Sequence, residues 1–182
     1  MFNLEKLVRP NIQKLTAYSS ARDEYKQDTA NMLFLDANEN PFTNGLNRYP
    51  DPQQSSIKQI LAKEKGLKTS QILLGNGSDE VLDLIFRAFC EPGKDAVITL
   101  PPTYGMYKVL ADLNNLENRE VLLKSDYQPD VPAILNTIDN RTKLLFLCSP
   151  NNPTGNVFDA EKIDQLISEF NGIVVIDEAY ID

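Results

Sequence analysis

Residues 143–155 read Lys-Leu-Leu-Phe-Leu-Cys-Ser-Pro-Asn-Asn-Pro-Thr-Gly, so an apolar run is followed at once by a loop of proline, asparagine and glycine. The run from Leu144 to Leu147 is apolar at every position, which indicates a strand that is covered on both faces. Prolines on both sides of an asparagine, with a glycine beyond, indicate a turn. The stretch therefore predicts a buried strand with a polar loop at its carboxyl end.

Helical and strand patterns alternate on both sides of this stretch. Short apolar runs predict further strands at residues 72–74, 96–100, 120–123 and 173–176. Apolar residues at helical spacing predict helices at residues 53–65, 78–89, 103–113, 131–138 and 160–170. This alternation is typical of an α/β fold, in which helices cover both faces of a mainly parallel sheet.

The composition narrows the class of protein. The 182 residues hold 18 Lys and Arg against 26 Asp and Glu, a formal net charge of -8, which disfavours binding to nucleic acid or to an anionic membrane. Cys90 and Cys148 fall in apolar patterns, which predicts buried thiols rather than a disulfide framework. The start resembles no signal peptide, and no apolar segment has the length of a bilayer. We therefore expect a cytoplasmic protein that binds neither nucleic acid, membrane nor metal.

The most polar loops follow the ends of predicted strands. They comprise residues 75–80, 101–107, 149–155 and 177–180. Ligands of parallel α/β sheets bind beyond the carboxyl ends of the strands. We therefore expect the four loops to converge on one ligand site.

The loop of residues 75–80 reads Gly-Asn-Gly-Ser-Asp-Glu and opens a predicted helix. Its glycines allow close approach of the backbone, and the first amides of the helix can bind a phosphate. Glu80 stands where a dinucleotide-binding motif needs its third glycine, so that motif is excluded. The alternative interpretation is plain capping of the helix by Ser78, with Asp79 and Glu80 complementing the helix dipole.

Asp177 and Asn152 are the strongest candidates for ligand contacts. Asp177 follows an apolar strand, where an ionised carboxylate is costly to bury unless a cation such as a protonated heterocyclic nitrogen meets it. The alternative for Asp177 is capping of the next turn. Asn152 lies between Pro150 and Pro153, which would hold its amide in a fixed direction, as a ligand contact requires.

Six segments, in their order along the chain, resemble the fold-type I aminotransferases, which use pyridoxal phosphate. They are Leu35-Asp36-Ala37-Asn38-Glu39-Asn40-Pro41, Arg48-Tyr49-Pro50-Asp51, Gly75-Asn76-Gly77-Ser78-Asp79-Glu80, Pro101-Pro102-Thr103-Tyr104, Ser149-Pro150-Asn151-Asn152-Pro153-Thr154-Gly155 and Asp177-Glu178-Ala179-Tyr180. The first three look most like histidinol-phosphate aminotransferases. The resemblance implies that residues 51–182 are part of the cofactor-binding large domain. Residues 1–50 would be an N-terminal arm with part of the small domain.

The resemblance also implies roles around the ring of pyridoxal phosphate. Asp177 would make a charge-assisted bond to the pyridinium nitrogen. Asn152 and Tyr180 would hydrogen-bond the phenolic oxygen, and Tyr104 would stack on the ring. Asp177 and Tyr180 are the catalytic candidates that the chain itself carries.

Further implied roles concern the phosphate and the substrate. Gly77, Ser78 and Asp79 would hold the cofactor phosphate. Tyr49 would reach the phosphate from the partner subunit of a homodimer, and Asn38 would lie near the substrate. The plain alternative for Tyr49 is packing beside Pro50, and Tyr104 could likewise be an ordinary half-buried aromatic residue.

The implied reaction is a transamination in histidine biosynthesis. Glutamate would donate the amino group, and imidazole acetol phosphate would accept it to become histidinol phosphate. Family members carry their Schiff-base lysine in a Ser-x-x-Lys segment that follows the Asp-Glu-Ala-Tyr segment, and residues 1–182 hold no lysine after Tyr180, so these residues alone are expected to be inactive. The alternatives are a threonine-phosphate decarboxylase, an aromatic aminotransferase, or a truncated, non-catalytic module that binds phosphate or cofactor.

Overall fold

The computed structural model describes residues 3–19, 35 and 37–182. The chain forms two compact units, one of Met1–Lys14 with Gly75–Asp182 and one of Leu15–Leu74. The units do not divide at residue 50, and the assignment of residues 1–50 to an arm with part of a small domain stays a prediction. No helix in the described ranges is long and apolar enough to cross a membrane.

The larger unit is built on a parallel sheet in the order β2-β1-β3-β4. Its strands are β1 (Ala96–Thr99), β2 (Glu117–Glu120), β3 (Thr142–Cys148) and β4 (Ile173–Asp177). All three strand pairs are parallel, and Cys148 at the end of β3 lies opposite Asp177 at the end of β4. The loops that follow these two strands therefore start side by side. The expected α/β fold with a parallel sheet is confirmed.

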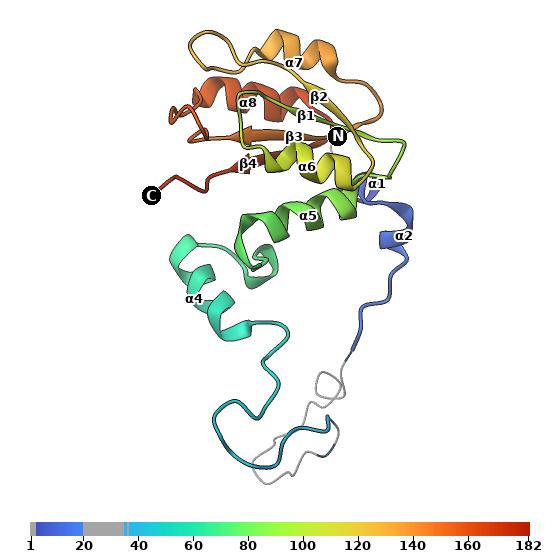
Figure 1. The fold of residues 1–182 in the computed structure, drawn as a ribbon, viewed down its shortest axis with the longest axis vertical. Helices are drawn as coiled ribbons and strands as arrows, with labels where there is room; N and C mark the ends of the chain where they lie inside the picture. The colour runs from blue at the N-terminus through green and yellow to red at the C-terminus, as the bar shows by residue number, and fades with distance from the viewer. Residues whose placement is uncertain (1–2, 20–34, 36) are drawn as a thin grey trace. The chain divides into compact units, whose positions relative to one another are not determined.

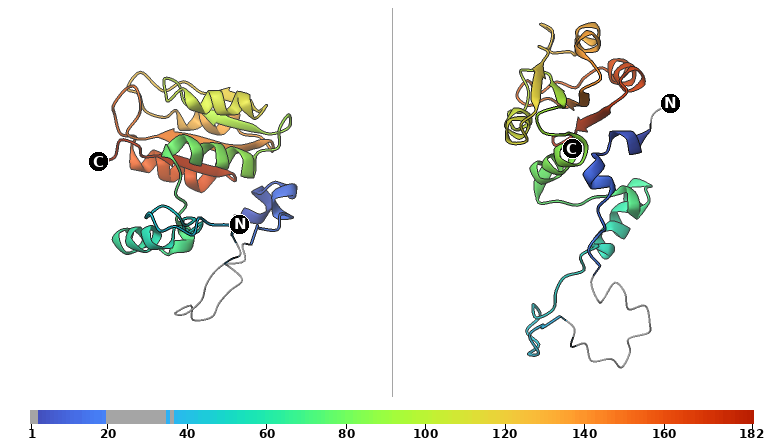
Figure 2. Two further views of the ribbon diagram at one scale, coloured as in Figure 1. Left: turned by 60° about the horizontal axis from the view of Figure 1, so that its bottom comes forward. Right: turned by 90° about the vertical axis from the view of Figure 1, so that its right-hand side faces the viewer.

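Helices cover both faces of the sheet, two on each side (Figures 1 and 2). They are α5 (Gly77–Phe89) and α6 (Met106–Leu113) on one face, and α7 (Val131–Thr137) and α8 (Ala160–Glu169) on the other. Leu144, Phe146 and Cys148 of β3 pack in the core under α5 and α6, whereas Leu145 and Leu147 pack in the core under α7 and α8. Because successive side chains of a strand point to opposite faces, both cores need apolar residues, which explains the unbroken apolar run.

Two predicted strands differ from the structure. Residues 72–74 form no strand, and the side chain of Leu73 is 59% exposed, because this short run has no strand beside it in the described part of the chain. The strand expected at residues 120–123 is regular only over Glu117–Glu120. The apolar residues after β2 still pair irregularly with the end of β1 and the residues that follow it. The amide of Val121 donates to the Thr99 carbonyl at 3.0 Å, and the amide of Leu123 donates to the Pro101 carbonyl at 2.8 Å. The apolar pattern marked where the chain is buried, not where regular pairing begins.

The first described residues belong to the larger unit. Helices α1 (Leu4–Leu7) and α2 (Pro10–Gln13) flank Arg9, which meets the last turn of α5. The Arg9 amide donates to the Ala88 carbonyl at 3.0 Å, and its guanidinium donates to the Arg87 carbonyl at 2.9 Å. A cation that binds the last carbonyls of a helix also complements the helix dipole. Arg9 therefore fastens the beginning of the chain to α5.

The smaller unit contains α4 (Ser55–Lys65) and a short 3-10 helix, η1 (Thr69–Gln71). Gly66 ends α4 in the left-handed conformation, with φ of 66°, as its place after the periodic apolar residues predicts. The apolar side chains of Ile57 and Ile60 on α4 are exposed.

Candidate active site

The four polar loops come together at the carboxyl edge of the sheet, as expected. The hydroxyl of Tyr107 donates to Oδ2 of Asp177 at 2.6 Å, which joins the second loop to the fourth. The hydroxyl of Tyr104 donates to Oδ1 of Asp79 at 3.1 Å, which joins the second loop to the first. The amide of Ser149 donates to the Asp177 carbonyl at 2.9 Å, which joins the third loop to the fourth. Hydrogen bonds thus link all four loops.

Asp177 is a buried carboxylate whose own unit supplies no cation in the described residues. Its side chain accepts hydrogen bonds from the Tyr107 hydroxyl at Oδ2 and from the Ala179 amide at Oδ1, and the residue is 9% exposed. Among the residues that the structure describes, no arginine or lysine forms an ion pair with it. Burying an ionised carboxylate without a cation is costly. The arrangement therefore suits a ligand that brings a positive charge, such as a protonated ring nitrogen.

Tyr107 is a site residue that the sequence analysis missed. Its ring is buried, stacks on Phe146 with centroids 4.9 Å apart, and meets Tyr104 edge to face at 5.6 Å. Burial, followed by the hydrogen bond to Asp177, raises the pKa of Tyr107 far above its usual value, so the phenol stays a hydrogen-bond donor. The available signal was its position three residues after Tyr104, a spacing that brings two side chains together where a helix begins.

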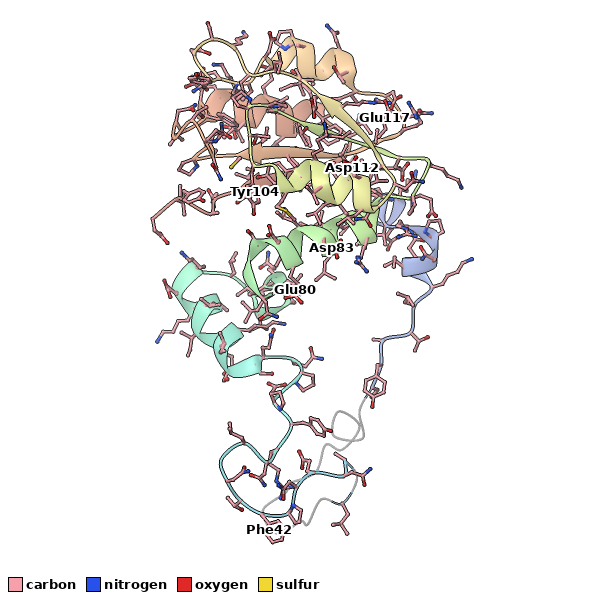
Figure 3. All side chains as sticks on the ribbon, viewed as in Figure 1. Phe42, Glu80, Asp83, Tyr104, Asp112 and Glu117 are labelled. Carbon is pink, nitrogen blue, oxygen red and sulfur yellow. The ribbon has the colours of Figure 1, made fainter. Side chains whose placement is uncertain are left out.

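Tyr104 lies just before α6, on the side of the first loop (Figure 3). Its ring is half-buried, and burial together with the bond to Asp79 raises the pKa of its hydroxyl. The hydroxyl is held by Asp79, and the ring edge packs on Tyr107. Tyr104 is thus an aromatic side chain of fixed orientation next to Asp177, although its stacking role stays a prediction.

The start of α5 differs in detail from the expected cap. The N-cap is Asn76, whose backbone amide donates to the carboxylate of Glu80. Ser78 lies inside the first turn and makes no capping hydrogen bond. Capping by Ser78 was therefore wrong, because the helix begins at Gly77 and its cap, Asn76, lies two residues before Ser78. Gly77 adopts a φ of +78°, which favours glycine.

The amides of this first turn are well suited to an anion. The exposed hydroxyl of Ser78 forms no hydrogen bond with any residue in the described ranges. The Asp79 carboxylate is held by Tyr104, so Asp79 can offer an anion its backbone amide. The first amides of a helix lack partners in the helix and carry its positive dipole end. The loop therefore has the chemistry to bind a phosphate through Gly77, Ser78 and Asp79, and that role stays a prediction.

Two neighbouring asparagines in the third loop have different surroundings. Asn151 is buried, and its amide nitrogen donates to the Pro102 carbonyl at 2.9 Å and to the Thr154 hydroxyl at 2.6 Å. Its Oδ1 accepts from the Thr103 hydroxyl at 3.2 Å. Asn152 is partly exposed, and its side-chain amide makes no hydrogen bond to another described residue. Asn151, which the sequence analysis missed, holds two loops together, whereas the side-chain amide of Asn152 is left without a partner among the described residues and its ligand contact stays a prediction.

Tyr180 follows Asp177 in the fourth loop and is 61% exposed. It lies near enough to Tyr104 to contribute, after burial and Asp79, to the raised pKa of that residue. Its hydroxyl makes no hydrogen bond in the part of the chain that is described. Tyr180 therefore lies close to Tyr104 with an exposed side chain, and its contact with a ligand stays a prediction.

Asn38 and Tyr49 belong to the smaller unit and meet there. Both line a polar pocket of about 240 Å³. Its centre is Glu39, which accepts from Arg48 at 2.7 Å and from the Tyr49 amide at 2.8 Å. Asp36, from the same motif, lies outside the described residues. The structure thus brings the two predicted residues to one pocket, and their roles toward substrate and partner stay predictions.

The carboxyl edge of the larger unit has a defined chemistry. It combines a buried carboxylate in need of a cation, an oriented aromatic ring, an available amide and a helix start that suits a phosphate. No group of three or more metal-binding side chains occurs among the residues described. The fold and the site define a parallel α/β domain whose polar loops suit a flat, phosphorylated and cationic ring, and the binding of such a ring stays a prediction.

Comparison with known proteins supports this class. The family model described as aminotransferase class I and II matches residues 21–182, so the chain belongs to that family. A histidinol-phosphate aminotransferase of Christiangramia forsetii is 69% identical over 181 residues, which cover 100% of this chain and 52% of the relative. One of Flavobacterium johnsoniae is 65% identical, again over 100% of this chain and 52% of the relative. The chain spans about half the length of the curated relatives it matches.

Solved structures confirm the fold. Histidinol-phosphate aminotransferase from Sinorhizobium meliloti, solved with pyridoxal 5'-phosphate, matches with a TM-score of 0.67 and 27% identity over 74% of this chain and 37% of that chain. Alanine aminotransferase from Pyrococcus furiosus matches with a TM-score of 0.61 and 28% identity over 70% of this chain and 34% of that chain. The larger unit is therefore part of the fold-type I architecture, and the fold alone does not distinguish between substrates.

Proposed function

We propose that the protein is a pyridoxal-phosphate-dependent aminotransferase that interconverts histidinol phosphate and imidazole acetol phosphate, with glutamate and 2-oxoglutarate as the second pair. The main observation in favour of the cofactor is that Asp177 is a buried carboxylate for which the described residues of the larger unit provide no cation. The substrate is supported by the identity of 54–69% to relatives named histidinol-phosphate aminotransferase. The neighbouring asparagine and tyrosines suit the same ring.

The proposed roles follow from the chain's own contacts. Bound pyridoxal phosphate supplies an electron-withdrawing ring that stabilises negative charge on the substrate carbon. Asp177 holds the proton on the ring nitrogen through a charge-assisted hydrogen bond. Asn152 and Tyr180, whose side chains make no hydrogen bond to other described residues, donate to the phenolic oxygen. Tyr104 covers a face of the ring and fixes its tilt.

The phosphate is held by the first turn of α5. The amides of Ser78 and Asp79 and the Ser78 hydroxyl donate to its oxygens, while Gly77 lets the backbone turn toward it. Tyr49 completes the phosphate site from the partner subunit of a homodimer, and Asn38 contacts the substrate. These two assignments rest on the family resemblance and on the pocket that both residues line. A cytoplasmic location also stays a prediction.

The decisive experiment uses protein made from the complete gene. We expect its cofactor absorbance to change on borohydride reduction, with a mass increase that shows a covalently held cofactor. We also expect turnover of histidinol phosphate with 2-oxoglutarate to exceed turnover of aromatic amino acids by at least about 100-fold in kcat/KM, because a site that hydrogen-bonds a polar group discriminates strongly against substrates without it.

Other results would each refute a different part of the proposal. Release of carbon dioxide from threonine phosphate, or equal turnover of aromatic amino acids, would refute the substrate and keep the cofactor. A full-length protein that binds no cofactor would refute the whole assignment and favour a non-catalytic module. A monomer in sedimentation equilibrium would refute the shared site that Tyr49 requires.

A further inference from the structure

Tyr107, in the first turn of α6, holds the carboxylate of Asp177. The Tyr107 hydroxyl donates to Oδ2 at 2.6 Å, and the Ala179 amide donates to Oδ1 at 3.1 Å. The backbone of Asp177 is fixed separately, by its register with Cys148 and by the Ser149 amide. Main chain and side chain of Asp177 are therefore held by different elements, and α6 controls the side chain.

The position of the Tyr107 hydroxyl is itself fixed by packing. The ring stacks on Phe146 with an interplanar angle of 19°, and Phe146 stacks on Phe86 at 5.0 Å. The edge of the ring meets Tyr104 at 87°. A buried aromatic side chain that is packed on two sides cannot swing its hydroxyl away without opening the core. The hydroxyl of Tyr107 is therefore a preorganised donor.

We propose that Tyr107 is a positioning residue, whose hydroxyl holds the Asp177 carboxylate in the orientation that receives the ring nitrogen of the cofactor. An ionised carboxylate can accept about four hydrogen bonds, so the two donors leave room for a cationic one. This inference rests on the proposed function, because it concerns the same site.

Tyr107 also packs against Tyr104, the residue that is proposed to stack on the cofactor ring. Tyr104, the proposed stacking residue, touches the Tyr107 ring, and its own hydroxyl is held by Asp79. One short segment at the start of α6 therefore sets both the aromatic surface and the carboxylate. Tyr107 thus acts through Asp177 and does not itself touch the ligand.

A double-mutant cycle on the full-length apoprotein tests the inference. The variants are Tyr107→Phe, which keeps the ring and removes the hydroxyl, Asp177→Asn, and the two combined. The readout is the dissociation constant for pyridoxal phosphate, from absorbance titration, with thermal unfolding of each apoprotein. Tyr127→Phe, the same chemical change at a side chain that is 46% exposed, is the matched control.

We expect Tyr107→Phe to raise the dissociation constant about 10-fold, as loss of a hydrogen bond to a charged group predicts. In the Asp177→Asn background the same change should raise it no more than about 2-fold, because the charge that the hydroxyl serves is gone. Tyr127→Phe should leave it unchanged. A merely structural role would lower the unfolding temperature and give the same factor in both backgrounds, which would overturn the inference.

Failure of the inference and failure of the proposed function look different. If Asp177→Asn weakens cofactor binding and Tyr107→Phe does not, the positioning role is wrong and the cofactor site stands. If the unaltered protein binds no pyridoxal phosphate, or Asp177→Asn leaves binding intact, the cofactor assignment itself is wrong and the inference falls with it.

Discussion

The two ends of the parallel sheet differ in the partners of their carboxylates. At the amino end, Arg119 pairs with Glu117 at 2.9 Å and with Asp139 at 2.8 Å, and Arg141 pairs with the same two carboxylates. At the carboxyl end, the buried Asp177 meets a phenol and an amide, and no cation in the described residues. Figure 3 labels Glu117 at the first end and Tyr104 at the second.

The difference separates structural charge from functional charge. Carboxylates that a neighbouring arginine neutralises can stay charged without a ligand, and they fix the strands at the amino end. A buried carboxylate without such a partner leaves part of its burial cost uncompensated until a ligand arrives. Sites of this kind are often functional. Substitutions at the two ends should therefore affect different properties, stability at one and activity at the other.

The largest contrast is expected between two Asp→Asn substitutions. Asp177→Asn in the full-length protein should lower kcat/KM for transamination on the order of 100-fold or more, because it removes the charge that holds the ring proton. Asp139→Asn, at the amino end, should leave the rate per folded molecule unchanged. Steady-state kinetics of both purified proteins provide the measurement. Similar losses in the two variants would break the comparison.

Adjacent asparagines sharpen the same contrast inside one loop. Asn151→Ala removes a buried amide and leaves the Pro102 carbonyl and the Thr103 hydroxyl without this partner, which should lower the free energy of unfolding by about 3 kcal/mol. Asn152→Ala should change stability little and weaken cofactor binding instead. Urea denaturation and cofactor titration of both variants separate the two effects. A stability loss in Asn152→Ala equal to that in Asn151→Ala would contradict the assignment.

At the amino end, Arg119→Ala should destabilise the protein by about 2 kcal/mol, which is less than the loss of a fully buried ion pair because its carboxylate partners are partly exposed. The Arg119 side chain is 12% exposed and also donates to the Thr137 carbonyl and to the Thr142 hydroxyl. Arg87→Ala, which removes an exposed pair with Asp83, is the control and should cost less than about 0.5 kcal/mol. Denaturant unfolding measures both, and cofactor affinity should stay constant. Reduced cofactor affinity in Arg119→Ala would connect the two ends and refute their independence.

Acid should weaken the amino end in a defined direction. The Arg119 guanidinium holds the pKa of Asp139 well below its usual range, and it also lowers the pKa of Glu117. A carboxyl group with a depressed folded-state pKa stabilises the fold above its unfolded pKa, near 4, and this contribution is lost as the pH falls through the folded pKa. The stability difference between the unaltered protein and Asp139→Asn should therefore be largest near neutral pH and shrink below about pH 4. A difference that grows toward low pH would have the wrong sign.

Much of this architecture follows from the sequence. The unbroken apolar run of β3, the helical spacing in α5 and α8 and the glycine after α4 predicted elements that the structure contains. The edge strand β2 was placed three residues too late, because its residues are polar and only the buried residues after it are apolar. An edge strand is specified by backbone pairing, which side-chain patterns report poorly.

The site shows the same limit. Asp177 and Asn152 stood out because a polar residue beside an apolar strand or between prolines is conspicuous in the sequence. Tyr107 and Asn151 did not, since an aromatic residue in a helix and an asparagine in a turn are ordinary. Their importance arises from contacts with residues 70 and 49 positions away in the chain, which only the fold brings close.

The smallest expected effect concerns the turn at Gly77, where α5 begins. Gly77 has a φ of +78°, and an added Cβ would meet no atom within 4 Å, so Gly77→Ala should cost about 1 kcal/mol through backbone strain alone. Gly105→Ala, where a Cβ would likewise meet nothing and φ is -66°, should be neutral or slightly stabilising. Thermal unfolding of the two variants measures the difference. If both substitutions are neutral, the positive φ is not required for this turn, and the backbone of residues 75–80 can reach its conformation without glycine.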